Sequence, residues 1–196
     1  MTVSDYLEKQ FNITLTRNAA ALIGKGAFPV DFPRGTIVLH EGDRASNLYG
    51  IVSGLVRGFY IDSDGNDVTK CFSAEREFFS TEGFRTDSAS SFSVECLEDC
   101  TCIRFPYTLI RGCMEEDEGI RNTVNTLFLR EVEKLETRAR KLMVLDAEER
   151  YRDFCREYPG LLSRVPLLHI ASYIGIRPAS LSRIRKKIQK NTSELT

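Results

Sequence analysis

The spacing of the apolar residues changes at Pro106, and this change limits the folds open to the chain. Before Pro106, from Pro33 to Phe105, the apolar runs are short and are interrupted by Gly, Asp, Asn and Ser. These runs are TIVLHEG, LYGIVSG, LVRGFYI, VTKCF, FSVECL and TCIRF. Short apolar runs interrupted in this way are typical of the many short strands of a sandwich or barrel. After Pro106 the steps become three and four residues, which indicates helices. The pattern therefore predicts an α+β chain with a β-rich first part.

One hairpin can be located within the β-rich part. Asp64-Gly65-Asn66 separates LVRGFYI from VTKCF. An Asp-Gly pair between apolar runs is a strong hairpin signal, and a two-residue turn of this kind needs positive φ at both positions. We therefore expect a tight turn there.

A long amphipathic helix is predicted from about Gly119 to Leu145. Its other faces are charged, so the apolar stripe is narrow and resembles the seam of a coiled coil. A homodimer through this seam is the natural expectation; the alternative is that the stripe packs on the chain's own β domain. The expected dimer seam comprises Val124, Phe128, Val132, Leu135, Ala139 and Leu142.

Two further segments carry helix-boundary signals. Asp146 is suited to cap a helix over AEERYRDFCREY, since its carboxylate can accept bonds from free N–H groups of the first turn. Pro159-Gly160 should end that helix, and Pro166 should be the first residue of the next one.

The segment LLHIASYIGIRPASLSRIRKKI, from Leu167 to Ile188, has the spacing of two short helices joined by a tight turn. Gly175 falls where the chain must reverse with positive φ. The residues expected to face inward are Ile170, Ala171, Ile174, Leu181 and Ile184. A helix-turn-helix of this kind is a DNA-binding motif.

Charge is distributed unevenly along the chain. The net charge is −1 at pH 7, but the stretch from Arg177 to Lys190 holds six Lys or Arg and no acid. This is the sign expected of a nucleic-acid footprint, although a solvated helix face is the simpler reading of charge alone. The expected DNA-binding residues are Arg177, Ser180, Ser182, Arg183, Arg185, Lys186 and Lys187. Arg183 is the best candidate for reading guanine, whereas Arg185, Lys187 and Lys190 suit phosphate.

Other functional classes find little support in the sequence. The first residues, MTVSDYLEKQF, lack the basic start and apolar run of a signal peptide, and no apolar stretch reaches membrane-spanning length, so a cytoplasmic protein without a membrane partner is expected. Cys96, Cys100 and Cys102 are close in sequence, but the spacing favours buried thiols over a metal or redox site, and no metal is expected. His40 and His169 have no partner at catalytic spacing, so we expect no catalytic residues and no enzyme.

The segment from Ala147 to Lys187, together with RGTIVLHEGD, LYGIVSGLVRGFY and DSDGNDV, resembles the Crp/Fnr family of transcription factors. The resemblance implies a cyclic-nucleotide-binding-like β jelly roll over residues 1–115, a dimerisation helix over 116–145 and a helix-turn-helix domain over 146–196. It also implies a homodimer on a palindromic operator in double-stranded DNA, with RNA polymerase as a further partner.

The sensor part departs from the family pattern. Cyclic-nucleotide-binding members carry a Gly-Glu pair and later an Arg-Ser or Arg-Thr pair. These positions fall on Phe79, Ser80, Ser90 and Ser91, so only the last hydroxyl is kept. Without the guanidinium and the carboxylate, the strong charge-assisted bonds to a cyclic nucleotide are lost, and cyclic AMP is not expected. No cysteine precedes Cys71, so the iron–sulfur cluster of the oxygen-sensing branch is not expected either.

The sequence is also compatible with an unknown small-molecule effector, for example another anion held by Arg85. The residues that could line its pocket are Phe79, Ser80, Phe84, Arg85, Ser90, Ser91 and Phe92. Alternatively, the phenylalanines fill the barrel.

The second helix of the predicted helix-turn-helix also departs from the family pattern. Pro178 and Ala179 stand where the founding member has a base-reading arginine and glutamate, and Arg183 alone is retained. The operator should therefore differ from that of the cyclic-AMP receptor, and no β-hairpin wing is expected after the second helix.

A competing hypothesis is a ligand-binding or protein-interaction module whose C-terminal helices dock a protein partner.

Overall fold

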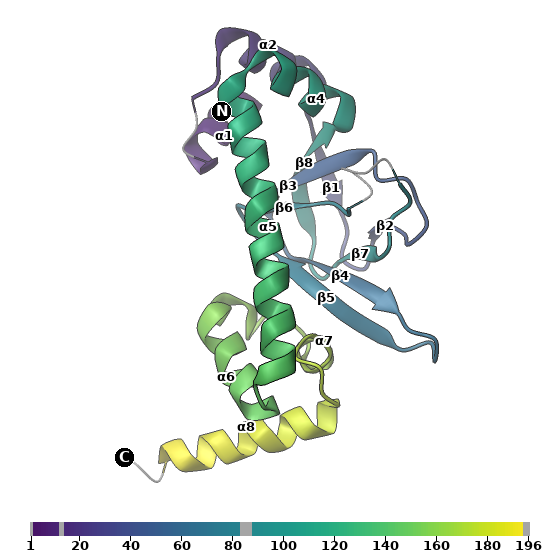
Figure 1. Cartoon of the computed structure of the whole chain (residues 1–196), viewed down its shortest axis with the longest axis vertical. Helices are drawn as coiled ribbons and strands as arrows, with labels where there is room; N and C mark the ends of the chain where they lie inside the picture. Colours follow the sequence, from purple (N-terminus) through teal and green to yellow (C-terminus); the bar gives the residue numbers. More distant parts are fainter. Residues whose placement is uncertain (1, 12–13, 83–87, 194–196) are drawn as a thin grey trace. The chain divides into compact units, whose positions relative to one another are not determined.

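The computed structural model describes residues 2–11, 14–82 and 88–193 (Figure 1). The chain forms two compact units, Met1–Tyr60 with Cys71–Glu131 and Ile61–Lys70 with Val132–Thr196. The boundaries expected at residues 115 and 145 stay a prediction. No helix in the described ranges is long and apolar enough to span a bilayer.

Two four-stranded sheets confirm the predicted jelly-roll-like fold, with strand orders β1-β8-β3-β6 and β2-β7-β4-β5. Neighbours such as β3 and β8 or β4 and β7 pair antiparallel. The strands are β1 Phe28–Phe32, β2 Ile37–Leu39, β3 Asn47–Ser53, β4 Val56–Ile61, β5 Asp67–Ser73, β6 Phe78–Phe79, β7 Ser93–Cys96 and β8 Cys100–Pro106. Each of the six apolar runs contains a strand, whereas β1 and β6 were not anticipated.

The sheets enclose an apolar core. Its buried members are Ile51, Val56, Phe79, Phe92, Val94, Cys96, Cys100 and Cys102. Packing is close at Gly58, where a Cβ would lie 2.8 Å from the Sγ of Cys71 and 2.8 Å from a ring carbon of Phe92. Burial raises the pKa of the Cys102 thiol to about 12. The three clustered cysteines are therefore buried thiols, and no group of metal-ligating side chains occurs within the described ranges.

The β4–β5 hairpin lies where it was predicted, but its turn is longer than expected. Gly65 has φ +79°, and Asp64 is not among the residues with positive φ. The N–H of Gly65 donates to the carbonyl of Asp62, and the N–H of Asp62 donates to the carbonyl of Asn66. The Asp62 carboxylate accepts further bonds from the N–H groups of Asp64 and Asn66. A turn with one left-handed glycine thus replaces the expected two-residue turn, because Asp62 satisfies its inner N–H groups.

Three helices pack beside the first sheet: α1 Val3–Phe11, α2 Arg17–Gly26 and α4 Tyr107–Glu116. They share a core with β8 residues such as Phe105 and with Ile120 of the long helix. The hydroxyl of Tyr6 donates to the carbonyl of Ile51 at 3.0 Å, which ties α1 to β3. No sequence pattern predicted α1 or α2.

The long helix α5 spans Glu118–Val144, one residue earlier at each end than predicted. Asp117 precedes it, and its carboxylate accepts bonds from the N–H groups of Ile120 at 3.0 Å and Thr16 at 3.2 Å. These bonds lower the pKa of Asp117. In the first unit, Ile120 is buried and Val124 packs against the same core.

The second unit contains α6 Ala147–Glu157, the short 3₁₀ helix Pro159–Leu161, α7 Leu167–Tyr173 and α8 Pro178–Ser193 (Figure 1). Asp146 forms the predicted cap, completed by Glu149 as a capping box. Pro166 is the N-cap of α7 and not its first helical residue as predicted, since the helix begins at Leu167, and the Pro166 carbonyl accepts the N–H of His169.

Candidate nucleic-acid interface and effector cavity

The turn between α7 and α8 has the predicted helix-turn-helix geometry. Gly175 has φ +72°, and its N–H donates to the carbonyl of Ser172, while the N–H of Ile176 donates to that of Ala171. Glycine adopts this left-handed conformation at no steric cost, so it can reverse the chain immediately after α7. Four of the inward-facing residues are buried, namely Ile170, Ala171, Ile174 and Leu181, and Ile184 is half-buried.

Polar contacts within the second unit hold α7 in place. The Ser172 hydroxyl accepts the N–H of Thr69 at 2.8 Å and donates to the carbonyl of Asp67 at 3.2 Å. Arg138 of α5 donates from Nη2 to the carbonyls of Thr69 and Tyr173, at 3.0 and 3.1 Å. Its guanidinium also lies over the Tyr173 ring, 4.6 Å from the ring centroid, in a cation–π contact. Helix α7, which precedes α8, is therefore held by hydrogen bonds to the backbone of β5 and by the Arg138 side chain of α5.

The outward face of α8 is polar and basic. Arg177, Ser182, Arg183 and Lys186 are exposed, whereas Ser180 is half-buried. The Arg183 side chain folds back toward the helix start, donating to the Ala179 carbonyl and the Ser180 hydroxyl, both at 3.4 Å. Hydrogen bonds of that length are weak. The guanidinium can therefore exchange them for bonds to another acceptor.

Two of the residues expected to bind phosphate have partners inside the protein. Lys187 lies 2.8 Å from the Glu148 carboxylate of α6, and this contact is the main cause of a lowered Glu148 pKa. Arg185 is half-buried and hydrogen-bonds the side chain of Tyr151. Burial, the larger influence on that phenol, raises its pKa. Arg177, Arg183 and Lys186 are exposed and take no part in these two contacts.

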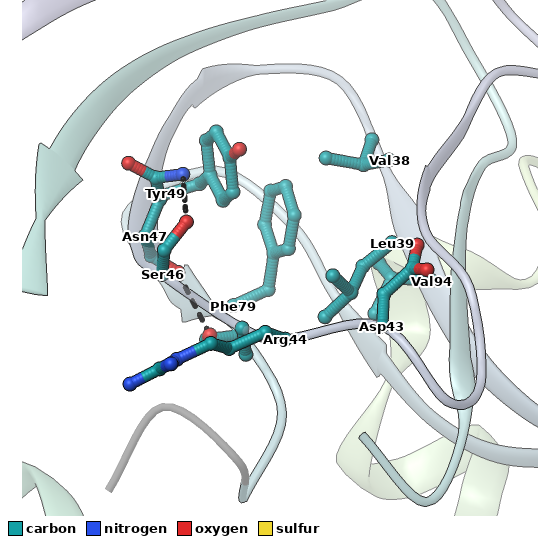
Figure 2. A pocket seen from close by; sticks show the side chains of 11 residues that line it. Val38, Leu39, Asp43, Arg44, Ser46, Asn47, Tyr49, Phe79 and Val94 are labelled. Atoms are coloured by element: carbon teal, nitrogen blue, oxygen red, sulfur yellow. Dashed lines mark hydrogen bonds between the residues drawn. The ribbon is translucent and has the colours of Figure 1, made fainter. Parts of the chain in front are cut away.

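A cavity of about 390 Å³ opens between the sheets of the first unit (Figure 2). The rings of Tyr49 and Phe79 stack at 5.0 Å on one side, facing Val38 and Leu39 on the other. Burial raises the pKa of Tyr49. The polar lining residues are Asp43, Arg44, Ser46, Asn47 and Ser80. The Arg44 side chain points away from Val38 and Leu39, so this cation is not aimed into the apolar end (Figure 2).

The structure separates the residues predicted for the effector pocket. Phe79 and Ser80 line the cavity, and the Ser80 hydroxyl donates to the Asn47 carbonyl at 2.8 Å. The hydroxyl of Ser90 is buried and bonded to that of Thr81 at 2.7 Å. The exposed Ser91 donates its N–H to Glu82. These two serines are absent from the cavity lining.

The remaining pocket residues divide in the same way. Phe92 is buried in the core and meets Tyr60 edge-on at 5.9 Å, as in the alternative in which the rings fill the barrel. Phe84 and Arg85 lie outside the described residues. The other lining residues, such as Val38, Asp43 and Tyr49, were not predicted, because the patterns of their segments indicate only strands and turns.

The predicted dimer seam follows one stripe of α5 but is buried unevenly. Val124, Phe128 and Leu135 are half-buried, whereas Val132, Ala139 and Leu142 are exposed. Leu129 and Met143, which the seam prediction omitted, are the most exposed apolar side chains of the helix apart from Val144. Their sequence signal was their position directly beside the stripe.

Comparisons with known proteins agree with this architecture. Residues 29–117 match the cyclic nucleotide-binding domain family. The nitrogen fixation regulation protein FixK of Bradyrhizobium diazoefficiens is 24% identical over 177 residues, covering 83% of this chain and 72% of FixK.

Solved structures show the same fold over most of the chain. FixK2 from Bradyrhizobium japonicum superposes with a TM-score of 0.77 at 18% identity, covering 85% of this chain and 86% of FixK2. The c-di-GMP-responsive global regulator CLP of Xanthomonas campestris gives a TM-score of 0.70 at 16% identity, covering 90% of this chain and 93% of CLP. FixK is thus a regulation protein and CLP a global regulator by their names. Residues 29–117 match a cyclic nucleotide-binding domain, and the chain is similar in sequence to FixK and has the fold of FixK2 and CLP.

Proposed function

We propose that this chain is a homodimeric, non-enzymatic transcription regulator that binds a palindromic operator in double-stranded DNA through α8. The observation that carries the proposal is the outward face of α8. It presents exposed Arg183 and Lys186, with exposed Arg177 directly before the helix, next to the Gly175 turn, and no acidic residue occurs from Arg177 to Lys190. A recognition helix needs this combination of rigid support and exposed donors to enter a major groove.

The dimer follows from the same reasoning. A palindromic operator requires two recognition helices related by a two-fold axis, and the exposed apolar residues Val132 and Leu142 of α5 supply a self-complementary surface. We place the protein in the cytoplasm with its operator, and RNA polymerase is the further partner that such a regulator would recruit or block.

Random-sequence selection with the purified full-length protein tests this function. We expect enrichment of a palindrome, with wild-type affinity that falls steeply as salt is raised because phosphate contacts release counterions. Arg183→Ala should reduce the preference for the enriched sequence over random DNA by about tenfold or more, since one bidentate arginine–guanine pair contributes at least this much.

Arg140→Ala is the matched control, because Arg140 is exposed on α5 and lies outside the predicted DNA-binding set. This variant should keep the preference. The proposal fails when no palindrome is enriched at moderate salt, or when Arg183→Ala binds the operator as the wild type does.

A second candidate function, docking of a protein partner by the C-terminal helices, is favoured by exposed leucines on α7. Leu168 is 57% exposed and Leu167 is 37% exposed. Leu168→Lys separates the two functions. A regulator should retain its operator affinity in this variant, whereas a docking module should lose its protein partner and show no sequence preference in either form.

The cavity is proposed as the site of a small effector other than cyclic AMP. Ser80 stands at the position where the family pattern has a ribose-binding carboxylate, and Arg44 points away from the apolar end. A buried cyclic phosphate would therefore lack its charge-assisted bonds. Millimolar cyclic AMP should leave the melting temperature unchanged, because only a ligand that binds the folded state raises it. A clear rise, abolished by Phe79→Leu, would reverse this assignment.

A further inference from the structure

The outward face of α8 forms a single stripe of exposed residues. Ala179, Ser182, Arg183 and Lys186 follow one another at steps of three, one and three, and all four are exposed. Leu181, on the opposite side, is fully buried. Residues at these spacings share one face of a helix, so the stripe is the surface that a major groove would meet.

Ala179 and Arg183 are adjacent within this stripe. They stand one helical turn apart, and Arg183 donates from Nε to the carbonyl of Ala179 at 3.4 Å. Four residues of α-helix rise about 6 Å, against about 3.4 Å between successive base pairs. The two side chains can therefore address positions that are about two base pairs apart or closer.

The chemistry of the two side chains restricts what they can read. The guanidinium can donate two bonds to O6 and N7 of guanine. The side chain of Ala179 has neither a donor nor an acceptor, so it cannot recognise a base through hydrogen bonds. The base-edge group in the major groove that an alanine methyl can distinguish by apolar contact is the C5 methyl of thymine.

We propose that each operator half-site contains a guanine read by Arg183 and, within two base pairs of it, a thymine whose methyl group contacts Ala179. This inference rests on the proposed function and specifies the sequence class that α8 selects. Arg183 and Ala179 have separate roles here: Arg183 donates hydrogen bonds to guanine, and Ala179 makes an apolar contact with the thymine methyl group.

Modified operators test the two roles separately in the full-length protein. The selected palindrome is synthesised with deoxyuridine in place of each thymine near the guanine, which deletes only the C5 methyl. Wild-type affinity should fall about fourfold for the contacted thymine, the effect of losing one buried methyl group. A second duplex carries 7-deazaguanine, which lacks the N7 acceptor, and should bind about tenfold more weakly.

Two variants assign these losses to residues. Ala179→Gly has no methyl group and should bind the thymine and deoxyuridine operators equally, while still responding to 7-deazaguanine. Arg183→Lys keeps the charge but cannot form the bidentate pair, so it should still distinguish thymine from deoxyuridine while losing most of its response to 7-deazaguanine. Circular dichroism and low-salt binding to random DNA establish that each variant is folded.

The result that overturns the inference is an enriched palindrome whose affinity is unchanged by deoxyuridine at every thymine near the guanine. Equal discrimination by wild type and Ala179→Gly would overturn it as well. Both results leave the proposed function standing, because the palindrome is still bound. Failure to enrich any palindrome would instead remove the proposed function itself.

Discussion

The two halves of α5 carry one continuous apolar pattern but differ in what covers it. In the first half, within Glu118–Glu131, Ile120 is buried and Val124 packs against a core shared with α1 and α2. In the second half, within Val132–Val144, Val132 is 41% exposed and Met143 is 79% exposed. The first half thus fits the alternative in which the stripe packs on the chain's own domain. The second half provides the uncovered surface that the predicted dimer requires.

The largest effect should come from a charge placed in the second half. Val132→Glu would put two carboxylates at the two-fold seam, where desolvation and like-charge repulsion oppose association. We expect a monomer in analytical ultracentrifugation and an operator affinity lowered by about 100-fold or more, because the two half-sites are no longer bound as one unit. The exposed Glu136→Gln is the control and should remain dimeric. A dimeric Val132→Glu would contradict the assignment of this half.

A smaller and different effect is expected in the first half. Val124→Ala removes two methyl groups that pack against the domain core, and should lower the free energy of unfolding by about 1–2 kcal/mol in urea titrations. Dimerisation at native conditions should persist. Dissociation without a loss of stability would instead place Val124 in the interface.

Acid should weaken the start of α5 in particular. The N–H groups of Thr16 and Ile120 stabilise the Asp117 carboxylate and lower its pKa in the folded state. The stability contributed by a lowered pKa is present above the unfolded value, about 3.9 for Asp, and is lost as pH falls through the folded value.

Asp117→Asn should therefore melt at a lower temperature than the wild type at neutral pH. This difference in melting temperature should shrink as the pH falls below about 4. The neighbouring Cys113 thiol, whose pKa is raised by burial and by Asp117, stays protonated in this range and does not interfere. A constant difference across the titration would exclude the carboxylate charge as the cause.

The smallest effect tests the width of the seam. Leu129 is 66% exposed but lies beside the predicted stripe and not within it. Leu129→Gln should change the dimer dissociation constant by less than about threefold, as expected for an exposed side chain outside an interface. A larger loss, measured by sedimentation at several concentrations, would show that the interface is wider than a coiled-coil seam.

Local sequence patterns predicted those elements whose hydrogen bonds join residues close together in the chain. The Asp146 cap and the Gly175 reversal each depend on hydrogen bonds within a few residues, so spacing alone located them. The turn at Gly65 shows the limit of this reasoning, because the side chain of Asp62 changed its length. The helices α1 and α2 were missed because their apolar residues follow no long period and are stabilised by contacts with distant segments.

The candidate sites were less predictable, since their residues meet through long-range contacts. The cavity joins Val38, Asp43 and Phe79 from separate segments, and no local pattern indicates that they share a wall. Lys187 had every sequence feature of a phosphate contact, but its pairing with Glu148 depends on how α6 and α8 pack. The exposure of Arg183, by contrast, followed from its helical spacing relative to Leu181.

The glycine turn also links the evolution of two distant positions. Any other residue at position 175 would have to adopt positive φ, and its Cβ would lie 3.2 Å from a terminal methyl of Leu142. Among homologous sequences, asparagine at 175 is therefore the most acceptable replacement, and it should appear together with a smaller side chain at 142. Covariation of this pair would mean that α5 cannot change its residue at 142 independently of the turn between α7 and α8.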